Sequence, residues 1–346
     1  MSAVTVLGIE SSCDETSAAV VSLEGDALRV RSCVTASQDD LHAEYRGVVP
    51  EIASRAHLES ILPVMRAALA QADLAASALS GVAAATRPGL IGSLLVGSSA
   101  GKGFAWGRSL PFVGVDHVAA HLVATLLDAP PVKWPAVGLV ASGGHTSLFA
   151  LRSALDAELL GATVDDAAGE AFDKAAALLD LGYPGGARLD AVANTGNSRA
   201  IDLPVASLPG LDFSFSGVKT ALALATKRAA TGVTREDFAA SFRRAVIAQI
   251  ARNLDRALGE TQAHSCLVGG GVAANTLLRS EAARICAARG CELRLAAPRW
   301  CTDNAAMIAG VGALRIAAGE RDPWDLAPMP LSTLARKPRV ARISRA

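Results

Sequence analysis

Two segments of this chain follow the same pattern, and this repetition limits the fold more than any other feature of the sequence. They are VTVLGIESSCDETSAAVVSLEG at residues 4–25 and PAVGLVASGGHTSLFALRSA at residues 135–154. Each has an aliphatic and β-branched run, a loop of small polar residues and a second apolar run, which predicts a β-hairpin. A hairpin that recurs about 130 residues later indicates a duplicated domain.

Helical and strand patterns alternate through both halves of the chain, which predicts an α/β fold with two lobes. The proline-rich stretch 128–135 predicts a linker between them. We expect residues 1–130 and 305–330 to form the first lobe, residues 131–304 the second, and residues 331–346 a flexible basic tail. Predicted elements are a helix from Pro50, a small-residue helix at 89–108, a strand at 111–116, helices at 164–182, 235–260 and 303–319, a strand, triple-glycine turn and helix at 265–290, and a strand at 291–298.

Composition and charge give no sign of a secreted protein, a membrane protein or a strongly basic protein. Lys and Arg number 33, as do Asp and Glu, so any contact with nucleic acid needs a local patch of cations. The six cysteines include no C-x-x-C pair, which favours reduced thiols. The chain starts without a signal-peptide pattern, and its longest uncharged stretch, 134–151, is broken by a polar loop. We therefore expect a cytoplasmic protein with no membrane contact.

The sequence VDHVAAH, at residues 115–121, places two histidines on one face of a predicted helix. Imidazoles at this spacing can share a transition metal, but they can also be ordinary hydrogen-bonded residues at a helix edge. A protease of the His-Glu-x-x-His type needs a glutamate where Val118 stands. Asp303, at the start of the last predicted helix, is either a helix cap or the carboxylate that joins His117 and His121.

Three further segments have residues suited to binding an anion. Gly269, Gly270 and Gly271 follow a strand and lead toward a helix, with Asn275 one turn inside it, which favours a nucleotide but also suits a plain tight turn. Lys219 lies in the first turn of a predicted helix that Ser216 could cap. Charged residues of GEAFDK, at 169–174, have apolar neighbours, which favours the wall of a cleft over a solvated face.

Taken together, these segments resemble the bacterial TsaD/Gcp family of tRNA N6-adenosine threonylcarbamoyltransferases, which have an actin-like ATPase (ASKHA) fold. The matching motifs, in order from about residue 4 to about residue 317, are GIESSCDETSAAVV, VVPEIASRAHL, LLVG, VGVDHVAAH, SGGHTSL, DDAAGEAFDK, YPGG, FSFSGVKTA, GGGVAAN and TDNAAMIA. Arg46 and Arg87 stand where the family usually has glycine.

The resemblance implies two duplicated lobes, each a mixed sheet flanked by helices, with the active site in the cleft between them. It implies transfer of a threonylcarbamoyl group from threonylcarbamoyl-AMP to N6 of adenosine 37, in tRNAs that read codons beginning with A. It implies one divalent metal, iron or alternatively zinc, an adenine nucleotide, and three partners: the tRNA anticodon loop, the paralogous actin-like subunit TsaB and the P-loop ATPase TsaE.

The resemblance also assigns residues by motif. The implied metal ligands are His117, His121 and Asp303. The implied substrate contacts are Val140, Ala141, Ser142, Gly143, Gly144, Asp173, Gly186, Asp190 and Asn275, with further phosphate or substrate contacts at Glu10, Ser12, Asp14, Lys219 and Gly270. No covalent nucleophile is assigned, because the acyl donor is already an activated mixed anhydride.

Three other functions compete with this one. A metalloprotease would need a general base, and this chain has Val118 at the position of that glutamate. An actin-like kinase or ATPase would use Glu10 and Asp14 for magnesium and phosphate but does not need the histidine pair. A non-enzymatic scaffold would leave the site residues without a role. The basic tail, with cations at 336, 337, 339, 342 and 345, is predicted either to bind tRNA phosphates without setting specificity or to be solvated without a partner.

Overall fold

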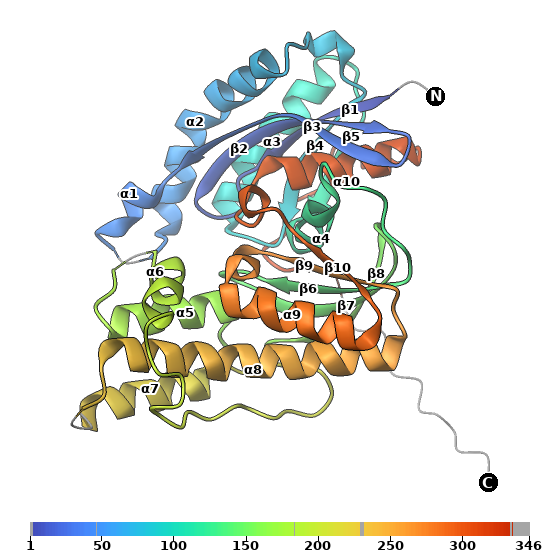
Figure 1. The fold of residues 1–346 in the computed structure, drawn as a ribbon. Coiled ribbons are helices and arrows are strands. Elements are labelled where there is room, and N and C mark those ends of the chain that lie inside the picture. Colours follow the sequence, from blue (N-terminus) through green and yellow to red (C-terminus); the bar gives the residue numbers. More distant parts are fainter. Residues whose placement is uncertain (1–2, 46, 183, 229–231, 333, 335–346) are drawn as a thin grey trace.

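A computed structural model describes residues 3–45, 47–182, 184–228, 232–332 and 334. Its two five-stranded sheets lie one above the other in Figure 1, each with its own set of helices. Arg46 and the basic positions from 336 onward lie outside the described residues. Among the described residues, no helix combines the length and the apolar character needed to cross a membrane.

The first sheet has the strand order β3-β2-β1-β4-β5. The predicted hairpin is present: β1 and β2 are antiparallel, and β4 and β5 extend the sheet in parallel to β1. The structure adds β3, which was not predicted, beyond β2. The strand bounds are β1 (Val4–Glu10), β2 (Glu15–Glu24), β3 (Ala27–Ser37), β4 (Gly81–Arg87) and β5 (Phe112–Asp116).

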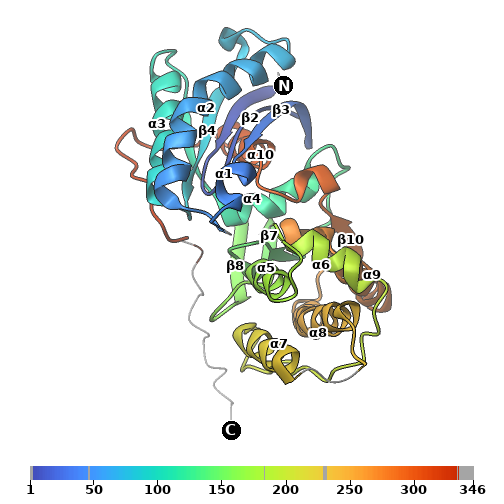
Figure 2. The ribbon, with the colours of Figure 1, turned by 90° about the vertical axis from the view of Figure 1, so that its left-hand side faces the viewer.

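Helices cover both faces of this sheet. Alternate residues of β1, such as Leu7 and Ile9, pack with α2 (Pro50–Gln71) and α3 (Ile91–Trp106) on one face. The opposite face carries α10 (Ala305–Ala317), which approaches so closely that a Cβ on Gly8 would lie 2.5 Å from the Ala305 carbonyl oxygen. Residues near the end of the chain therefore belong to the same layer as the first strands (Figures 1 and 2).

The second sheet has the order β10-β9-β6-β7-β8 and repeats the arrangement of the first. Its antiparallel hairpin, β6 with β7, is the second predicted hairpin, and β9 and β10 extend it in parallel. The strand bounds are β6 (Ala136–Ala141), β7 (Thr146–Ser153), β8 (Asp156–Ala162), β9 (Ser265–Gly269) and β10 (Glu292–Leu295). The duplication predicted from the two hairpins is thus visible in the sheets.

The remaining helices lie mainly around the second sheet, with α4 (His117–Val123) in contact with both lobes. The helices α5 (Ala168–Leu178), α6 (Gly186–Ala193), α7 (Ser216–Arg228), α8 (Arg235–Thr261) and α9 (Thr276–Arg289) pack together. Short helical segments are α1 (Asp39–Ala43), η1 (Ala76–Ala78), η2 (Ala124–Leu126), η3 (Gly271–Ala274) and η4 (Pro298–Trp300). All six cysteines are free thiols, as expected.

Three local predictions were wrong, each for a definable reason. The helix expected over 164–182 begins only at Ala168, because Asp165 and Asp166 bond other segments instead. The triple-glycine turn leads first into η3, so Asn275 is the N-cap of α9 and not a residue one turn inside it. Ser216, expected as a possible cap of α7, is the first residue of that helix, and Asp165 bonds the helix start instead by accepting hydrogen bonds from the Phe215 and Ser216 amides.

Candidate metal centre and adjoining loops

The helix α4 presents both histidines from a buried position between the lobes. Asp116, the last residue of β5, is its N-cap: Oδ1 accepts hydrogen bonds from the amides of Val118 (3.0 Å) and Ala119 (3.4 Å). His117 and His121 follow one turn apart on the same helix face, and their rings lie edge to face with centroids 4.7 Å apart. Both side chains are buried.

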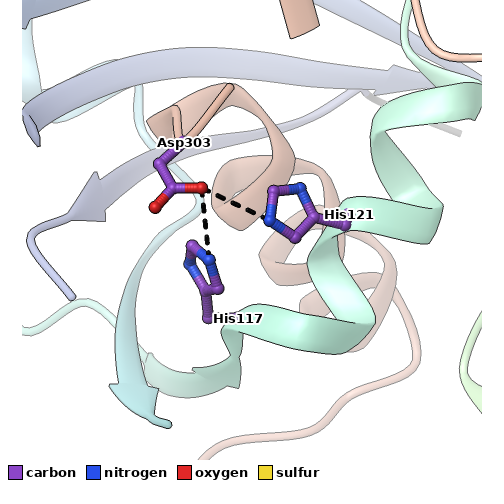
Figure 3. A group of neighbouring side chains, drawn as sticks. All are labelled: His117, His121 and Asp303. Carbon is purple, nitrogen blue, oxygen red and sulfur yellow. Dashed lines mark ion pairs between the residues drawn. The ribbon is translucent and has the colours of Figure 1, made fainter. Parts of the chain in front are cut away.

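Asp303 completes a group with the two histidines (Figure 3). Its Oδ1 lies 3.4 Å from His117 Nε2 and 3.3 Å from His121 Nε2. Asn304, and not Asp303, caps α10, since Asn304 Oδ1 accepts a hydrogen bond from the Met307 amide. The cap alternative for Asp303 is therefore wrong, and its carboxylate is available to face the histidines.

The donor atoms of this group fit a metal ion. One ligand atom from each residue lies within 4.8 Å of the others, which is close enough for all three to reach one cation. Neither ring nitrogen of His121 has a hydrogen-bond partner within the described residues, although the side chain is buried. A buried polar atom without a partner is costly, and a bound cation would satisfy it. Two imidazoles and one carboxylate suit a divalent transition metal with coordination positions left open for substrate.

Glu10 fixes the orientation of His117. Its Oε2 accepts a hydrogen bond from His117 Nδ1 (2.8 Å), and its Oε1 accepts one from the Ser12 amide (2.5 Å). With the proton on Nδ1, Nε2 turns toward Asp303. The carboxylate of Glu10, predicted as a phosphate contact, thus lies buried behind His117, and Ser12 Oγ lies 3.2 Å from the same Nδ1.

The charges in this group act strongly on one another. Burial lowers the pKa of His117, but Asp303 and Glu10 overcome this and raise it well above its usual value. Burial alone would raise the pKa of Asp303, whereas His117 and His121 bring it well below its usual value. The metal-free arrangement therefore holds the Asp303 carboxylate as an anion beside a His117 imidazole that keeps its proton, and a bound cation would displace that proton.

Three neighbouring residues were not singled out from the sequence. Burial and the nearby imidazoles of His117 and His121 lower the pKa of His145 to about 4, so this side chain is neutral near pH 7. Burial raises the pKa of Glu15 well above its usual value, and Asp303 and Asp14 add to the effect. Burial is also the main reason why the pKa of the Cys13 thiol is raised. Cys13 and His145 lie in the two hairpin loops and Glu15 begins β2, all within motifs that were recognised, so the signal was present in the sequence.

The loop between β6 and β7 offers exposed backbone. Val140 and Ala141 are buried in β6, so only their main-chain atoms could meet a ligand. Ser142 turns the chain: its amide donates to the His145 carbonyl (2.8 Å), and its Oγ accepts from the His145 amide (3.2 Å). Gly143 and Gly144 are exposed, and a Cβ on either would meet no atom within 4 Å. This open backbone can approach a ligand closely.

The first turn of α5 supports that loop. The amide of Gly169 donates to the Ser142 carbonyl (3.1 Å), and the amide of Glu170 donates to the Gly143 carbonyl (3.2 Å). Further along α5, Asp173 Oδ1 accepts from the amides of Gly185 and Gly186, each at 2.9 Å. Burial raises the pKa of Asp173, the two amides oppose this, and Asp14 from the first lobe adds to it.

Asp190 and Asn275 form a second polar group. Asp190 Oδ1 accepts from Asn275 Nδ2 (2.7 Å) and from Arg243 Nη1 (2.8 Å), while Asn275 Oδ1 caps α9. Gly270 has φ +91°, and a Cβ there would lie 2.4 Å from the Ala141 carbonyl oxygen. The triple-glycine turn therefore lies directly beside the end of β6, so both glycine-rich loops of the second lobe meet at one place.

Lys219 does not stand free for a phosphate. Its Nζ forms an ion pair with Asp166, and Lys174 pairs with the same carboxylate at 2.9 Å. Arg87, one of the departures from the family pattern, ends β4 opposite Asp116 in the β4–β5 ladder. The predicted site residues thus fall into the His–His–Asp group with Glu10 and Ser12, the loops around Ser142 and Gly270, and the Asp173 and Asp190 contacts, with Lys219 tied to Asp166.

Known proteins similar to this chain agree on one family. The TsaD family model, described as tRNA N6-adenosine threonylcarbamoyltransferase, matches residues 29–310. A protein of that name from Sorangium cellulosum (strain So ce56) is 47% identical over 354 residues, with 97% of this chain and 98% of that protein covered. Another of that name, from Symbiobacterium thermophilum (strain DSM 24528 / JCM 14929 / IAM 14863 / T), is 47% identical, with 94% and 95% covered.

Solved structures similar to this one confirm the predicted actin-like fold. HypF of T. kodakarensis superimposes with a TM-score of 0.62 at 16% identity, over 91% of this chain and 48% of HypF. Component A of (R)-2-hydroxyglutaryl-CoA dehydratase from Acidaminococcus fermentans gives a TM-score of 0.54 at 13% identity, over 91% of this chain and 99% of that protein. At such identities the likeness concerns the fold alone.

Proposed function

The chain belongs to the tRNA N6-adenosine threonylcarbamoyltransferase family, and on this premise we propose that it transfers a threonylcarbamoyl group from threonylcarbamoyl-AMP to N6 of adenosine 37 in tRNAs that read codons beginning with A. The observation that carries the proposal for the site is the His117–His121–Asp303 group beside two glycine-rich loops. It combines a site for a cation with backbone suited to an adenylate.

The metal proposed for the group is divalent iron, with zinc as the alternative. His117, His121 and Asp303 would hold it, and Glu10 would orient His117 from behind. When bound, such a cation would orient the threonyl group and polarise the acyl carbonyl. Nitrogen and oxygen ligands with open positions suit both metals, so the donor set supports either one.

The reaction needs positioning more than activation by the protein. The N6 amine attacks the carbamoyl carbonyl carbon, the new C–N bond forms, and the bond from that carbon to the phosphate oxygen breaks. AMP leaves with the electron pair, and the attacking nitrogen loses one proton. An exocyclic adenine amine is a weak nucleophile, so holding it in line with the carbonyl supplies much of the rate increase.

The nucleotide of the donor is proposed to lie along the second-lobe loops. Open backbone at Gly143 and Gly144 can approach phosphate oxygens, and the Asp190–Asn275 pair offers hydrogen bonds to a ribose or base. Asp173 and Gly186, which are hydrogen-bonded to each other, are proposed to line the same nucleotide site. Ser12 and Asp14 of the first hairpin are proposed to face the substrate from the other lobe.

The partners proposed are the tRNA anticodon loop, the paralogous subunit TsaB and the P-loop ATPase TsaE. Two neighbouring helices of the first lobe expose apolar pairs at i, i+4: Leu58 and Leu62 on α2, and Ile91 and Leu95 on α3. Side chains of this size that are 47% to 68% exposed support coverage by another protein. The adenosine of an anticodon loop can leave its stack, as the proposed reaction requires.

Product formation from defined components tests this function. Purified chain, unmodified tRNA and threonylcarbamoyl-AMP, with and without the two protein partners, are expected to yield N6-threonylcarbamoyladenosine and equimolar AMP. A tRNA with guanosine at position 37 should give none. Mass spectrometry of tRNA digests measures the product. ATP consumption without modified tRNA, under every combination of partners, would instead favour an actin-like ATPase.

Gly143→Ala is expected to weaken binding of threonylcarbamoyl-AMP or AMP by about tenfold, or about 1.4 kcal/mol. A Cβ at Gly143 meets no protein atom within 4 Å, so the fold has no reason to change and only a close ligand would be disturbed. Isothermal titration with AMP measures the effect. The substitution Gly270→Val is a poorer test, because its side chain would strain a φ of +91° and strike Ala141 whether or not a ligand is bound.

The matched control for Gly143→Ala is Gly217→Ala, since a Cβ there also meets no atom within 4 Å. Gly217 lies in the first turn of α7 and belongs to neither of the two glycine-rich loops. It should leave AMP affinity unchanged. Equal AMP affinity in both variants and the unaltered chain would remove the Gly143 loop from the nucleotide site.

A further inference from the structure

The segment that follows α10 returns along the edge of the first sheet. We name residues 320–332 and 334 the C-terminal strap. The Asp322 amide donates to the Phe112 carbonyl (2.8 Å), and its carboxylate accepts from the Gly114 amide (2.7 Å). Further on, the Met329 amide donates to the Thr86 carbonyl (2.9 Å). Because β5 is an edge strand, the two bonds to Phe112 and Gly114 satisfy backbone groups that would otherwise face solvent.

Side chains hold the first part of the strap firmly against β5. Trp324 stacks on Phe112 with ring centroids 6.5 Å apart. Leu326 lies over Gly114, where a Cβ would approach its Cδ2 to 2.4 Å. Arg315 of α10 pairs with Asp322 at 3.0 Å. Packing and ion pairing therefore set the path of the strap before it reaches α4.

The strap ends on α4. Ser332 Oγ donates to Asp116 Oδ2 at 2.6 Å, while Asp116 Oδ1 caps the helix. Leu334 packs against an apolar cluster that contains Val118 and Leu122 of α4. The same cluster contains Val140 and Phe149 of the second sheet. The Asp116 carboxylate thus bonds α4 with one oxygen and the C-terminal strap with the other.

This bond matters because α4 is short. A helix of seven residues has little stability of its own, so its direction depends on its cap and its packing. His117 is the first residue of the helix, directly after Asp116. A rotation of the Asp116 carboxylate would therefore change where the His117 and His121 imidazoles lie relative to Asp303.

We propose that Ser332 is a positioning residue for the metal centre: through Asp116 it fixes the cap of α4 and so sets the geometry of His117 and His121 toward Asp303. The inference rests on the proposed metal site, since positioning a centre requires that the centre exist. It assigns to the strap a role that the family's metal motifs do not contain, because Ser332 lies beyond the motif-matched region.

Cobalt binding tests this inference without any assay of activity. Metal-free full-length chain is titrated with Co²⁺ alone, whose visible absorption reports ligand geometry. Ser332→Ala is expected to weaken Co²⁺ binding roughly tenfold, the lower end for outer-sphere contacts, and to alter the spectrum. Ser332→Thr keeps the hydroxyl and should restore both. Urea unfolding of each metal-free variant checks that the fold persists.

Two shortened chains separate the strap from the basic residues that follow it. A chain that ends at residue 334 keeps the Ser332 contact and should bind Co²⁺ like the full chain. A chain that ends at residue 331 loses the contact and should resemble Ser332→Ala. Equal affinity and an identical spectrum for Ser332→Ala and the folded, unaltered chain would overturn the inference alone. Absence of Co²⁺ binding in the unaltered chain would overturn the metal centre together with it.

Discussion

His121→Ala is expected to lose nearly all bound metal and to reduce threonylcarbamoyl transfer by roughly 100-fold or more, since even outer-sphere changes reach that size at metal sites. The reason is local: His121 would contribute one of the three ligands, neither of its ring nitrogens makes a hydrogen bond within the described residues, and its Nε2 faces the Asp303 carboxylate at 3.3 Å. Its removal therefore takes away a metal ligand without orphaning a protein hydrogen bond. Elemental analysis of protein purified under anaerobic conditions measures the metal, and tRNA digests measure the transfer.

A comparison with His117→Ala sharpens this test. That substitution should lose the metal equally but also leave the buried Glu10 carboxylate without its imidazole partner. The unpaired group should cost about 1–3 kcal/mol in the free energy of unfolding of the metal-free chain. His264→Ala is the matched control, because His264 is exposed and precedes β9, at the opposite end of that strand from Gly269, the residue that contacts His121. Full metal content in folded His121→Ala would show that the histidines have another purpose.

The His117–His121–Asp303 group was predictable from the sequence because residue type and spacing carry its chemistry. Two histidines at i, i+4 must share a helix face, and the ordered family motifs pointed to Asp303. The duplicated hairpins predicted the two sheets for a similar reason, since strand alternation and small polar turns are local signals. Features that depend on residues close together in the chain, such as the histidine pair and the hairpins, could thus be predicted from the sequence.

Contacts between distant segments were not readable in this way. Nothing local shows that Asp165 bonds the start of α7, or that Asp166 pairs with Lys219. Nor does the sequence around Glu10 reveal that its carboxylate lies behind His117, 107 positions along the chain. The strands β3 and β8 were missed because their partly exposed faces weaken the apolar pattern. These features arise from packing of the whole fold, which sequence periodicity does not encode.

The second large effect is expected at the contact between the second sheet and α4. Gly269, the last residue of β9, lies so close to α4 that a Cβ would come within 2.1 Å of the His121 carbonyl oxygen and 2.9 Å of its carbonyl carbon. Both partners are backbone, so neither can rotate away. The contact therefore fixes the height of His121 above the second sheet.

Gly269→Ala is expected to destabilise the protein by about 1–3 kcal/mol, the usual cost of overpacking, and to weaken binding of Zn²⁺ or Co²⁺ by at least about tenfold. The added methyl group must push the last turn of α4 away from β9, and His121 would move from its place opposite Asp303. Urea unfolding measures the stability of the metal-free chain, and competition with a chelator measures the metal affinity.

Gly271→Ala, two residues later, is the control that makes this result specific. A Cβ at Gly271 meets no atom within 4 Å, so the substitution adds the same methyl group to the same turn without touching α4. It should leave both the free energy of unfolding and the metal affinity within about 0.5 kcal/mol of the unaltered chain. If Gly269→Ala matched Gly271→Ala in both measurements, α4 would have to be free to shift, and the rigid seating of His121 on the second sheet would be wrong. A loss confined to Gly269→Ala would show that the second lobe helps to position His121, whose partner Asp303 directly precedes the cap of α10 in the first lobe.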